Sequence, residues 1–328
     1  MSVQTKQETA AIHANGIAGQ PQQTKILSEN FCDQPSLLEN RSEPTTNFRM
    51  SSKPPVAPLA VLEPSHGWAL PDLASLWPYR ELLYFLVWRD IKVRYKQTAL
   101  GVAWAILQPF LTMVVFSIFL GRLGGLPSEG LPYPVFTYTA LLPWQLFANS
   151  MAASANSLIM NQQLITKVYF PRLLVPLAPV LVGLIDFALA FVVLLGMLAY
   201  YGIYPTLAIL TLPLWVLMAI ATALAVGLWL SALNVQYRDV QYTIPFLTQF
   251  WLFVTPVAYS ITLVPPAWRG WYALNPMVGV VEGFRWALLG QSGAPPGAIL
   301  VSVLVVSVLL FGGLFYFRKM EKSFADIV

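Results

Sequence analysis

The stretch Phe187–Tyr237 decides the fold class: FALAFVVLLGMLAYYGIYPTLAILTLPLWVLMAIATALAVGLWLSALNVQY. None of its 51 residues is Asp, Glu, Lys or Arg. One bilayer crossing takes roughly 20 apolar residues, so this stretch is long enough for two. Tyr201–Pro205 (YGIYP) supplies turn residues midway. The whole chain is 57% hydrophobic and 10% charged, whereas a soluble domain is about 25% charged. The sequence therefore predicts an integral membrane protein and excludes an ordinary water-soluble enzyme.

Six apolar segments, each close to the length of one crossing, make up the region 101–317. Backbone groups in lipid must pair within their own segment, so each segment is expected to be a helix. These continuous runs also differ from the alternating strands of about ten residues in a membrane β-barrel. The prediction is an all-α integral membrane protein whose six transmembrane helices are Val102–Gly121, Pro134–Asn156, Leu174–Tyr200, Thr206–Leu233, Ile244–Val264 and Ala298–Phe317.

The polar flanks complete the predicted domain organisation. Residues 1–65 are rich in Gln, Ser, Thr, Asn and Pro and are expected to be a disordered arm. Residues 66–100 would hold a cytoplasmic interfacial helix, and 318–328 a cytoplasmic tail. Six crossings place both termini on one side, which would hold eleven Lys and Arg residues near the membrane against three on the other. By the positive-inside rule both termini are expected in the cytoplasm, in a multi-pass protein of the inner membrane.

The segment Leu82–Gln97 has the pattern of an amphipathic surface helix. Apolar residues recur every four positions on one face, and three basic residues lie on the opposite face, which suits a helix on the membrane surface. Arg80 and Arg94 fall on the apolar side, where they either snorkel or meet a partner protein. A plain basic flank that only fixes the topology is the alternative. The two sets are Leu83, Val87, Ile91 and Tyr95, against Arg89, Lys92 and Lys96.

The connection 265–297, on the predicted outer side, is too aromatic for a free aqueous loop. We expect it to re-enter the membrane as short helices buried against protein. Within it, Glu282 and Arg285 are three residues apart, so that a helix would place them side by side as a structural ion pair. Its aromatic residues are Trp268, Trp271, Tyr272, Phe284 and Trp286.

Asp186 is the only charged residue within the six apolar segments. A carboxylate in a membrane is energetically costly and is usually functional or paired. No basic residue of the other segments can be named as its partner, and a protonated carboxyl group stays possible. We expect Asp186 to face a partner or water inside the helical bundle.

Two further patterns concern helix packing. The second segment carries Gln145, Asn149 and Asn156 near one face with serines beside them, which indicates either interhelical hydrogen bonds or a wet path. The fourth segment repeats small residues every four positions, which permits close helix contact within one subunit or between two. The serines are Ser150, Ser154 and Ser157, and the small residues are Ala219, Ala223, Gly227 and Ser231.

Aromatic residues in the first, second and fifth segments have two possible roles. Tyr and Trp are enriched where a membrane meets water. Alternatively, flat rings beside the hydroxyls of the fifth segment suit sugars, whose rings have apolar faces and polar edges. The candidate substrate path is Trp104, Tyr138, Trp144, Phe147, Trp251 and Tyr259.

Recognisable catalytic chemistry is missing from the sequence. It contains no phosphate-binding G-x-x-x-x-G-K-[ST] motif, no Cys/His cluster and no G-x-S-x-G motif. The sequence therefore predicts no catalytic residue, no metal site and no cofactor on this chain.

Four local motifs together resemble the membrane subunit of type-2 ATP-binding-cassette exporters of surface polysaccharides. Their order and their placement between the predicted spans also match that family, and the likeness runs from about residue 66 to the C-terminal tail. The motifs are VWRDIKVRYKQTALGVAW at 87–104 with Gln108-Pro109 after it, LITKVYFPR at 164–172, LNVQYRDV at 233–240, and LNPM at 274–277 continuing through EGFR at 282–285.

This resemblance implies a division of labour. Two copies of the chain would form a channel, and two copies of a separate ATPase, which bind ATP and Mg, would dock from the cytoplasm. The resemblance also implies aromatic residues along the path of the polymer. It places the ATPase contact at Arg89, Lys92, Arg94, Lys167, Tyr169 and Arg172, and an outer gate at Asn275, Pro276, Glu282 and Arg285.

The resemblance is closest to exporters of lipid-linked O-antigen chains, which implies a cargo of that kind, while exporters of capsule and teichoic acid share much of the pattern. A drug or small-lipid exporter of the same superfamily is the nearest alternative. A membrane glycosyltransferase would need carboxylates at the membrane edge, and the outer connections offer only Glu129 and Glu282. An ion-coupled carrier would usually show an internal repeat and several buried charges. No nucleic-acid partner is expected.

Overall fold

The computed structural model of this chain describes residues 73–96, 101–290, 296–321 and 324. The chain divides into two units, Met1–Glu63 and Pro64–Val328, and all described residues belong to the second. The predicted disordered arm, residues 1–65, lies outside the described residues.

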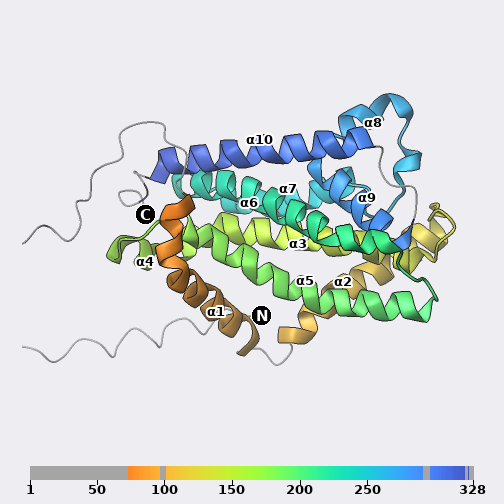
Figure 1. Cartoon of the computed structure of the whole chain (residues 1–328), viewed down its shortest axis with the longest axis horizontal. Coiled ribbons are helices and arrows are strands. Elements are labelled where there is room, and N and C mark those ends of the chain that lie inside the picture. The colour runs from red at the N-terminus through yellow and green to blue at the C-terminus, as the bar shows by residue number, and fades with distance from the viewer. Residues whose placement is uncertain (1–72, 97–100, 291–295, 322–323, 325–328) are drawn as a thin grey trace, which may run out of the picture. The chain divides into compact units, whose positions relative to one another are not determined.

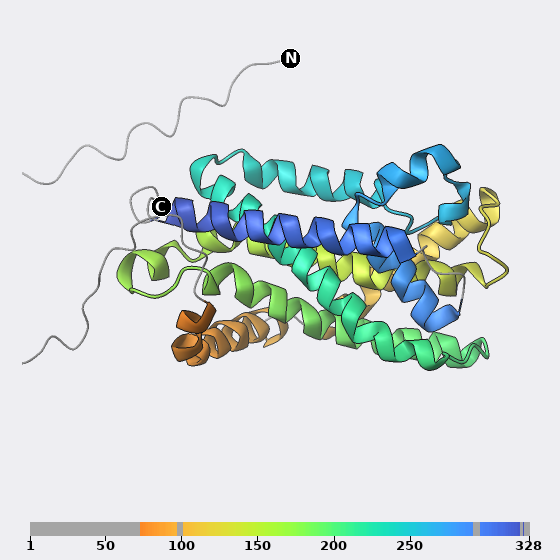
Figure 2. The same ribbon diagram turned by 45° about the horizontal axis from the view of Figure 1, so that its top comes forward.

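Helices make up the regular structure of the described part, and no strand occurs in it, which confirms the predicted all-α class. The long helices run side by side along one axis (Figure 1), and a view turned by 45° shows the same arrangement (Figure 2). They are α2 (Gly101–Phe116), α3 (Tyr133–Met160), α5 (Leu174–Tyr200), α6 (Leu212–Gln236), α7 (Val240–Val254) and α10 (Pro296–Glu321).

Shorter elements lie at the two ends of this bundle. One end, named here the α4 end, holds α4 (Gln162–Lys167) and the C-terminal end of α10 (Figure 1). The opposite end, the α9 end, holds α8 (Pro266–Tyr272) and α9 (Pro276–Leu289). The remaining elements are η1 (Leu73–Tyr79), α1 (Arg80–Lys96), η2 (Ser117–Leu123), η3 (Leu207–Thr211) and η4 (Ile261–Leu263).

Four stretches of the described chain are long and apolar enough to cross a membrane, as judged by length and composition. They are Val102–Leu123, Leu174–Tyr200, Leu207–Gln236 and Ile299–Glu321. They correspond to the first, third, fourth and sixth predicted segments and make this a multi-pass membrane protein. The second and fifth segments, which fall on α3 and α7, are not among them.

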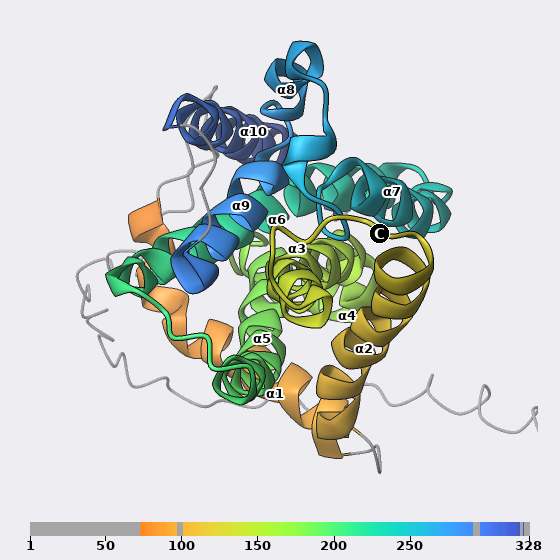
Figure 3. The ribbon, with the colours of Figure 1, turned by 90° about the vertical axis from the view of Figure 1, so that its right-hand side faces the viewer.

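α3 is the central helix of the bundle. Figure 3 looks along the bundle and shows α3 surrounded by α2, α5, α6 and α7. Of its 28 residues, 19 are buried, and they supply much of the apolar core, together with residues of α5, α6 and α9. A helix that is buried on nearly all sides can carry polar groups that contact other helices rather than lipid.

Small residues let α3 approach its two main neighbours closely. A Cβ atom added at Gly183 of α5 would lie 2.2 Å from Ser150 Oγ, and one added at Gly227 of α6 would lie 2.6 Å from Ser154 Oγ. The predicted ridge of small residues in the fourth segment is buried against this helix. The ridge therefore serves packing within one subunit, which settles a question that the sequence left open.

The fifth predicted segment, Ile244–Val264, is not one continuous helix. α7 ends at Val254, and Thr255 has the extended backbone angles φ −101° and ψ 135°. Proline disfavours helical geometry in the residue before it, and Pro256 has no amide hydrogen to continue the helix. Pro256 therefore ends α7, so the single helix predicted over Ile244–Val264 is wrong.

The connection between α7 and α10 differs from the prediction in one part. α9 is buried along most of its length, as expected, against α3, α6 and α10. α8 is exposed, with Trp268 62% and Trp271 70% accessible. The expected burial against protein therefore holds for α9 and is wrong for α8.

α1 confirms the helix expected over Leu82–Gln97, within the described residues. Its residue Leu86 is 1% exposed and belongs to a second apolar cluster, which also includes Leu158, Leu174 and Phe317. The apolar face of α1, which includes Leu83 and Val87, is thus half-buried against protein, mainly against α5. Exposed Tyr84 and Trp88 stack on another face, with their ring centres 6.4 Å apart.

Candidate functional site

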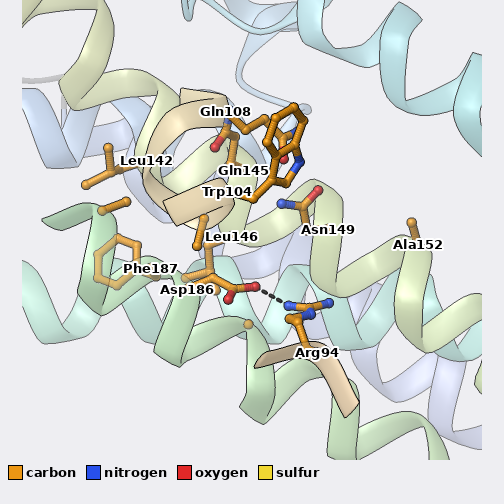
Figure 4. Close-up of a pocket in the computed structure, with 13 residues that line it drawn as sticks. Arg94, Trp104, Gln108, Leu142, Gln145, Leu146, Asn149, Ala152, Asp186 and Phe187 are labelled. Atoms are coloured by element: carbon orange, nitrogen blue, oxygen red, sulfur yellow. Dashed lines mark hydrogen bonds and ion pairs between the residues drawn. The ribbon is translucent and has the colours of Figure 1, made fainter. Parts of the chain in front are cut away.

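A cavity of about 550 Å³ lies between four helices and combines charged, amide and aromatic groups (Figure 4). Arg94 reaches it from α1, and Asp186 lines it from α5. Apolar side chains of α3 and α5 complete the wall. The remaining polar and aromatic groups are Trp104 and Gln108 from α2, Gln145 and Asn149 from α3, and Phe187 from α5.

Asp186 is paired with residues of α1, a helix outside the six predicted transmembrane segments. Its carboxylate accepts hydrogen bonds from the Arg94 guanidinium and from the Tyr95 hydroxyl, both on α1. The Asp186 side chain is 18% exposed and that of Arg94 is 42% exposed. The sequence analysis missed this pair because α1 was expected on the membrane surface. Arg94 contacts α5 of its own chain, which was neither of the two alternatives given for it.

The polar face of α3 divides between the two roles that the sequence left open. Gln145 and Asn149, one helical turn apart, line the cavity, which suits a wet path. Asn156 instead accepts a hydrogen bond from the Asn234 amide of α6 at 3.0 Å, and the serines face the packed helices. Among the described residues, the side-chain amides of Gln145 and Asn149 have no hydrogen-bond partner and are available to a ligand.

The six predicted substrate-path aromatics are not brought together at this cavity. Trp104 lines it and is 54% exposed. Tyr138, Trp144 and Phe147 are buried in the core of the single chain, where the Tyr138 hydroxyl donates to the Ala190 carbonyl at 3.2 Å. Their role along a polymer path stays a prediction.

Trp251 contributes to the network that fixes the start of α9. Its indole N–H donates to Asn275 Oδ1 at 3.0 Å, and that oxygen also accepts from the Met277 amide at 3.1 Å. Asn275 Nδ2 donates to Thr255 Oγ1 at 3.0 Å. Asn275 and Pro276 are therefore the N-cap and the first residue of α9, positions that favour these residue types. The hydroxyl of Tyr259, the sixth aromatic residue of the predicted path, lies 3.0 Å from the Tyr272 hydroxyl.

We expect Asn275→Ala to destabilise the protein by about 1–2 kcal/mol, because it removes an N-cap and two further hydrogen bonds. Asn275→Asp is the matched control, since it keeps the acceptor for Met277 and Trp251 and loses only the donor to Thr255. Thermal unfolding of the purified variants measures the difference. Equal melting temperatures for Asn275→Ala and the wild type would contradict the capping role.

Glu282 and Arg285 form the ion pair that their spacing predicted. Arg285 Nη1 lies 3.0 Å from Glu282 Oε1, and the two side chains are only 3–5% exposed. Arg285 also donates to the Val257 carbonyl at 2.8 Å, and its guanidinium carbon lies 3.7 Å from the ring centre of Phe136. Burial raises the pKa of Glu282, and the positive charge of Arg285 opposes that rise. The pair thus ties α9 to α3 and to the segment after α7.

The residues predicted to contact an ATPase lie in two groups. Lys167 and Tyr169 are exposed at the α4 end, with Tyr169 79% accessible. Arg172 instead contacts the end of α10, where its backbone N–H donates to Glu321 Oε1 at 3.2 Å and its guanidinium donates to the Glu321 carbonyl. On α1, Arg89 is 2.8 Å from Asp90, and Lys92 lies over the ring of Trp88.

No group of three or more His, Cys, Asp or Glu residues that could hold a metal occurs among residues 73–96, 101–290 and 296–321.

Residues 81–289 match the family model described as ABC-2 type transporter. The chain belongs to this family. The matched region begins in α1, ends in α9 and includes every residue that lines the cavity.

Curated relatives within the family are similar over most of their own length. An O-antigen export system permease protein, RfbA, of Myxococcus xanthus is 32% identical over 77% of this chain and 98% of its own. A Klebsiella pneumoniae protein of the same name is 29% identical over 76% and 95%. The polysialic acid transport protein KpsM of Escherichia coli is 23% identical over 72% and 92%.

Proposed function

We propose that this chain is the permease subunit of an ATP-driven exporter of lipid-linked, O-antigen-like polysaccharide. The observation that carries the proposal is the 32% identity to an O-antigen export permease over 98% of that relative's length. The cavity supports it, because its amides and its exposed Trp104 indole suit a sugar. The described residues offer neither a metal cluster nor a recognisable set of catalytic groups.

The proposed assembly contains two copies of this chain and two copies of an ATPase subunit that binds ATP and Mg. In each copy all six apolar segments cross the inner membrane, α9 re-enters it, and the α4 end faces the cytoplasm. Lys167 and Tyr169 are exposed at that end, as an ATPase contact requires. The basic residues counted on the predicted inner side support the same orientation.

The proposed transport step passes through contacts between the α4 end and α10. ATP binding closes the ATPase dimer and displaces α4. The Arg172–Glu321 contact carries this displacement to α10, which packs against α6 and α9. The two copies then separate enough for the sugar chain to pass between them, and Trp104 and further aromatic side chains give it weak successive contacts.

Export of a capsule-like polymer is the second candidate. It is supported by the similarity to the polysialic acid transport protein, which extends over 92% of that relative. The lower identity of 23%, against 32% for the O-antigen relative, makes it the weaker of the two. No feature of the described residues favours teichoic acid, a small lipid or a drug as the cargo.

Deletion of the gene, with separate analysis of surface and intracellular lipid-linked glycan, tests the proposed function. Loss of surface polymer together with accumulation inside the cell is the expected result, and the accumulated glycan identifies the cargo. Loss from both pools would point to a role in synthesis. Unchanged pools would point to a different cargo, such as a drug or small lipid.

Charge reversal of Arg89 and Lys92 to Glu is expected to lower co-purification of the ATPase several-fold, because basic residues at a contact attract an acidic partner surface. Arg122→Glu, outside the α4 end, is the matched control and is expected to leave co-purification unchanged. Pull-down of the ATPase with a tagged permease provides the measurement. If the double reversal retains the ATPase as well as the control does, these two residues act only as topology signals.

A further inference from the structure

The C-terminal turn of α1 is attached to α5 by polar contacts more than by apolar packing. Leu86, in the middle of the helix, is fully buried, whereas Val93 is 58% exposed and Lys92 and Lys96 are exposed as well. In this last turn, Arg94 and Tyr95 hold the Asp186 carboxylate. Loss of the Arg94 contact alone would leave the Tyr95 hydrogen bond as the one polar contact that holds this turn, so the turn would open more often, while the packing around Leu86 keeps the rest of α1 in place.

The same contact controls the electrostatics of the cavity. Arg94 and Asp186 are the charged residues among those that line it, and they neutralise each other. A guanidinium group binds phosphate oxygens as well as it binds a carboxylate, often through two parallel hydrogen bonds. An anion that enters the cavity thus competes with Asp186 for Arg94.

The other wall of the cavity suits a sugar next to such an anion. Figure 4 shows Gln108, Gln145 and Asn149 on the side of the cavity away from Asp186, together with the Trp104 ring. Side-chain amides donate and accept hydrogen bonds with hydroxyl groups, and an indole covers the apolar face of a sugar ring.

We propose that the cavity binds a sugar that carries a phosphate or diphosphate ester, and that the phosphate takes Arg94 from Asp186 and so releases the last turn of α1 from α5. Asp186 keeps its hydrogen bond from Tyr95 until that turn moves. This inference deepens the proposed function, on which it rests for the identity of the cargo. α1 carries predicted ATPase-contact residues, so release of its last turn would change the ATPase contact when a ligand occupies the cavity.

The test uses the full-length chain in lipid nanodiscs and farnesyl diphosphate-linked N-acetylglucosamine as the probe. Two quantities are measured: the half-saturating concentration of the probe and the hydrogen exchange of the amides of residues 91–96. In the wild type the probe is expected to bind and to accelerate exchange in this turn. Farnesol, which lacks the phosphates, is expected to leave exchange unchanged. Acceleration by farnesol to the same extent would overturn the proposal.

Two variants separate the anion site from the contact that it breaks. Asp186→Asn removes the competing charge, so exchange should be fast without the probe, and the probe should bind about three- to ten-fold more tightly. Arg94→Gln also breaks the contact and should give fast exchange, but it should weaken probe binding by at least about ten-fold. Asp90→Asn is the control, because Asp90 pairs with Arg89 and neither residue lines the cavity. Its probe affinity and its exchange rate should match those of the wild type.

A purely structural ion pair would give a different pattern. Asp186→Asn would then bind the probe no more tightly than the wild type, or Arg94→Gln would bind it equally well, and either result would overturn the proposal. Thermal unfolding of each variant confirms that the chain is folded. Tyr95→Phe, which leaves both charges in place, should accelerate exchange without changing probe affinity more than about three-fold.

Inorganic pyrophosphate distinguishes the source of the anion. If it accelerates exchange as the probe does, a free phosphate is sufficient; if only the prenyl-linked probe acts, the ligand is a lipid headgroup, and both results support the anion site. Failure of the export proposal is recognised separately. If gene deletion leaves both glycan pools unchanged while the purified protein still responds to the probe, the export proposal is wrong. The proposed anion site at Arg94 is then still supported.

Discussion

Arg285→Ala is expected to destabilise the protein by about 3–5 kcal/mol, because it leaves the Glu282 carboxylate buried without its partner. The change also removes the donor to the Val257 carbonyl and the guanidinium group that packs on the Phe136 ring. Unfolding of the purified protein in detergent, followed by heat or denaturant, measures the effect. A melting temperature equal to that of the wild type would show that this pair does not hold α9.

A double variant separates stability from a function of the pair. Replacing both members of a buried ion pair by apolar residues is often neutral or stabilising, so Glu282→Leu with Arg285→Met is expected to recover much of the lost stability. If the double variant is stable but does not export, the two charges act in the predicted outer gate. If it is stable and exports normally, the pair is structural only.

Gly283→Val is expected to destabilise the protein by about 3 kcal/mol through overpacking. A Cβ atom at Gly283 would lie 2.4–2.5 Å from three indole atoms of Trp215. That indole is buried, and its N–H donates to Thr211 Oγ1 at 3.1 Å, so it cannot move away freely. We expect α9 to lose its close contact with α6 in this variant.

Gly196→Val is the matched control for this prediction. Gly196 also lies within a helix, α5, but no atom approaches within 4 Å of the position where its Cβ would be. The recovered amount of monodisperse protein and its melting temperature are expected to fall for Gly283→Val and to stay close to wild type for Gly196→Val. Equal losses in both variants would mean that helix propensity, and not the contact with Trp215, is responsible.

Much of the fold follows from local patterns in the sequence. Apolar run length located the helices, since each run needs about 20 residues to cross a membrane. The i, i+3 spacing of Glu282 and Arg285 identified their ion pair, and four-residue spacing identified the ridge of small residues in α6. These features depend on neighbours along one helix, which the sequence displays directly.

The parts that the sequence analysis did not predict depend on how separate helices meet. The Arg94–Asp186 contact joins residues 92 positions apart and requires α1 to dock on α5. The amides of Gln145 and Asn149 differ from that of Asn156 only in which neighbour they face. The apolar run Ile244–Val264 predicted one helix, but the backbone becomes extended at Thr255, before Pro256, and α7 ends there. Trp251 and Asn275 were assigned separate roles, whereas one hydrogen bond joins them.

Reconstitution of transport tests the central claim most directly. The permease and its ATPase are placed together in liposomes with lipid-linked O-antigen glycan, and protected glycan on the far side of the membrane is measured with and without ATP. The account predicts ATP-dependent translocation that requires both proteins and is lost when the ATPase cannot hydrolyse ATP. Translocation by this chain without the ATPase, or none by the intact complex with any lipid-linked glycan, would contradict it.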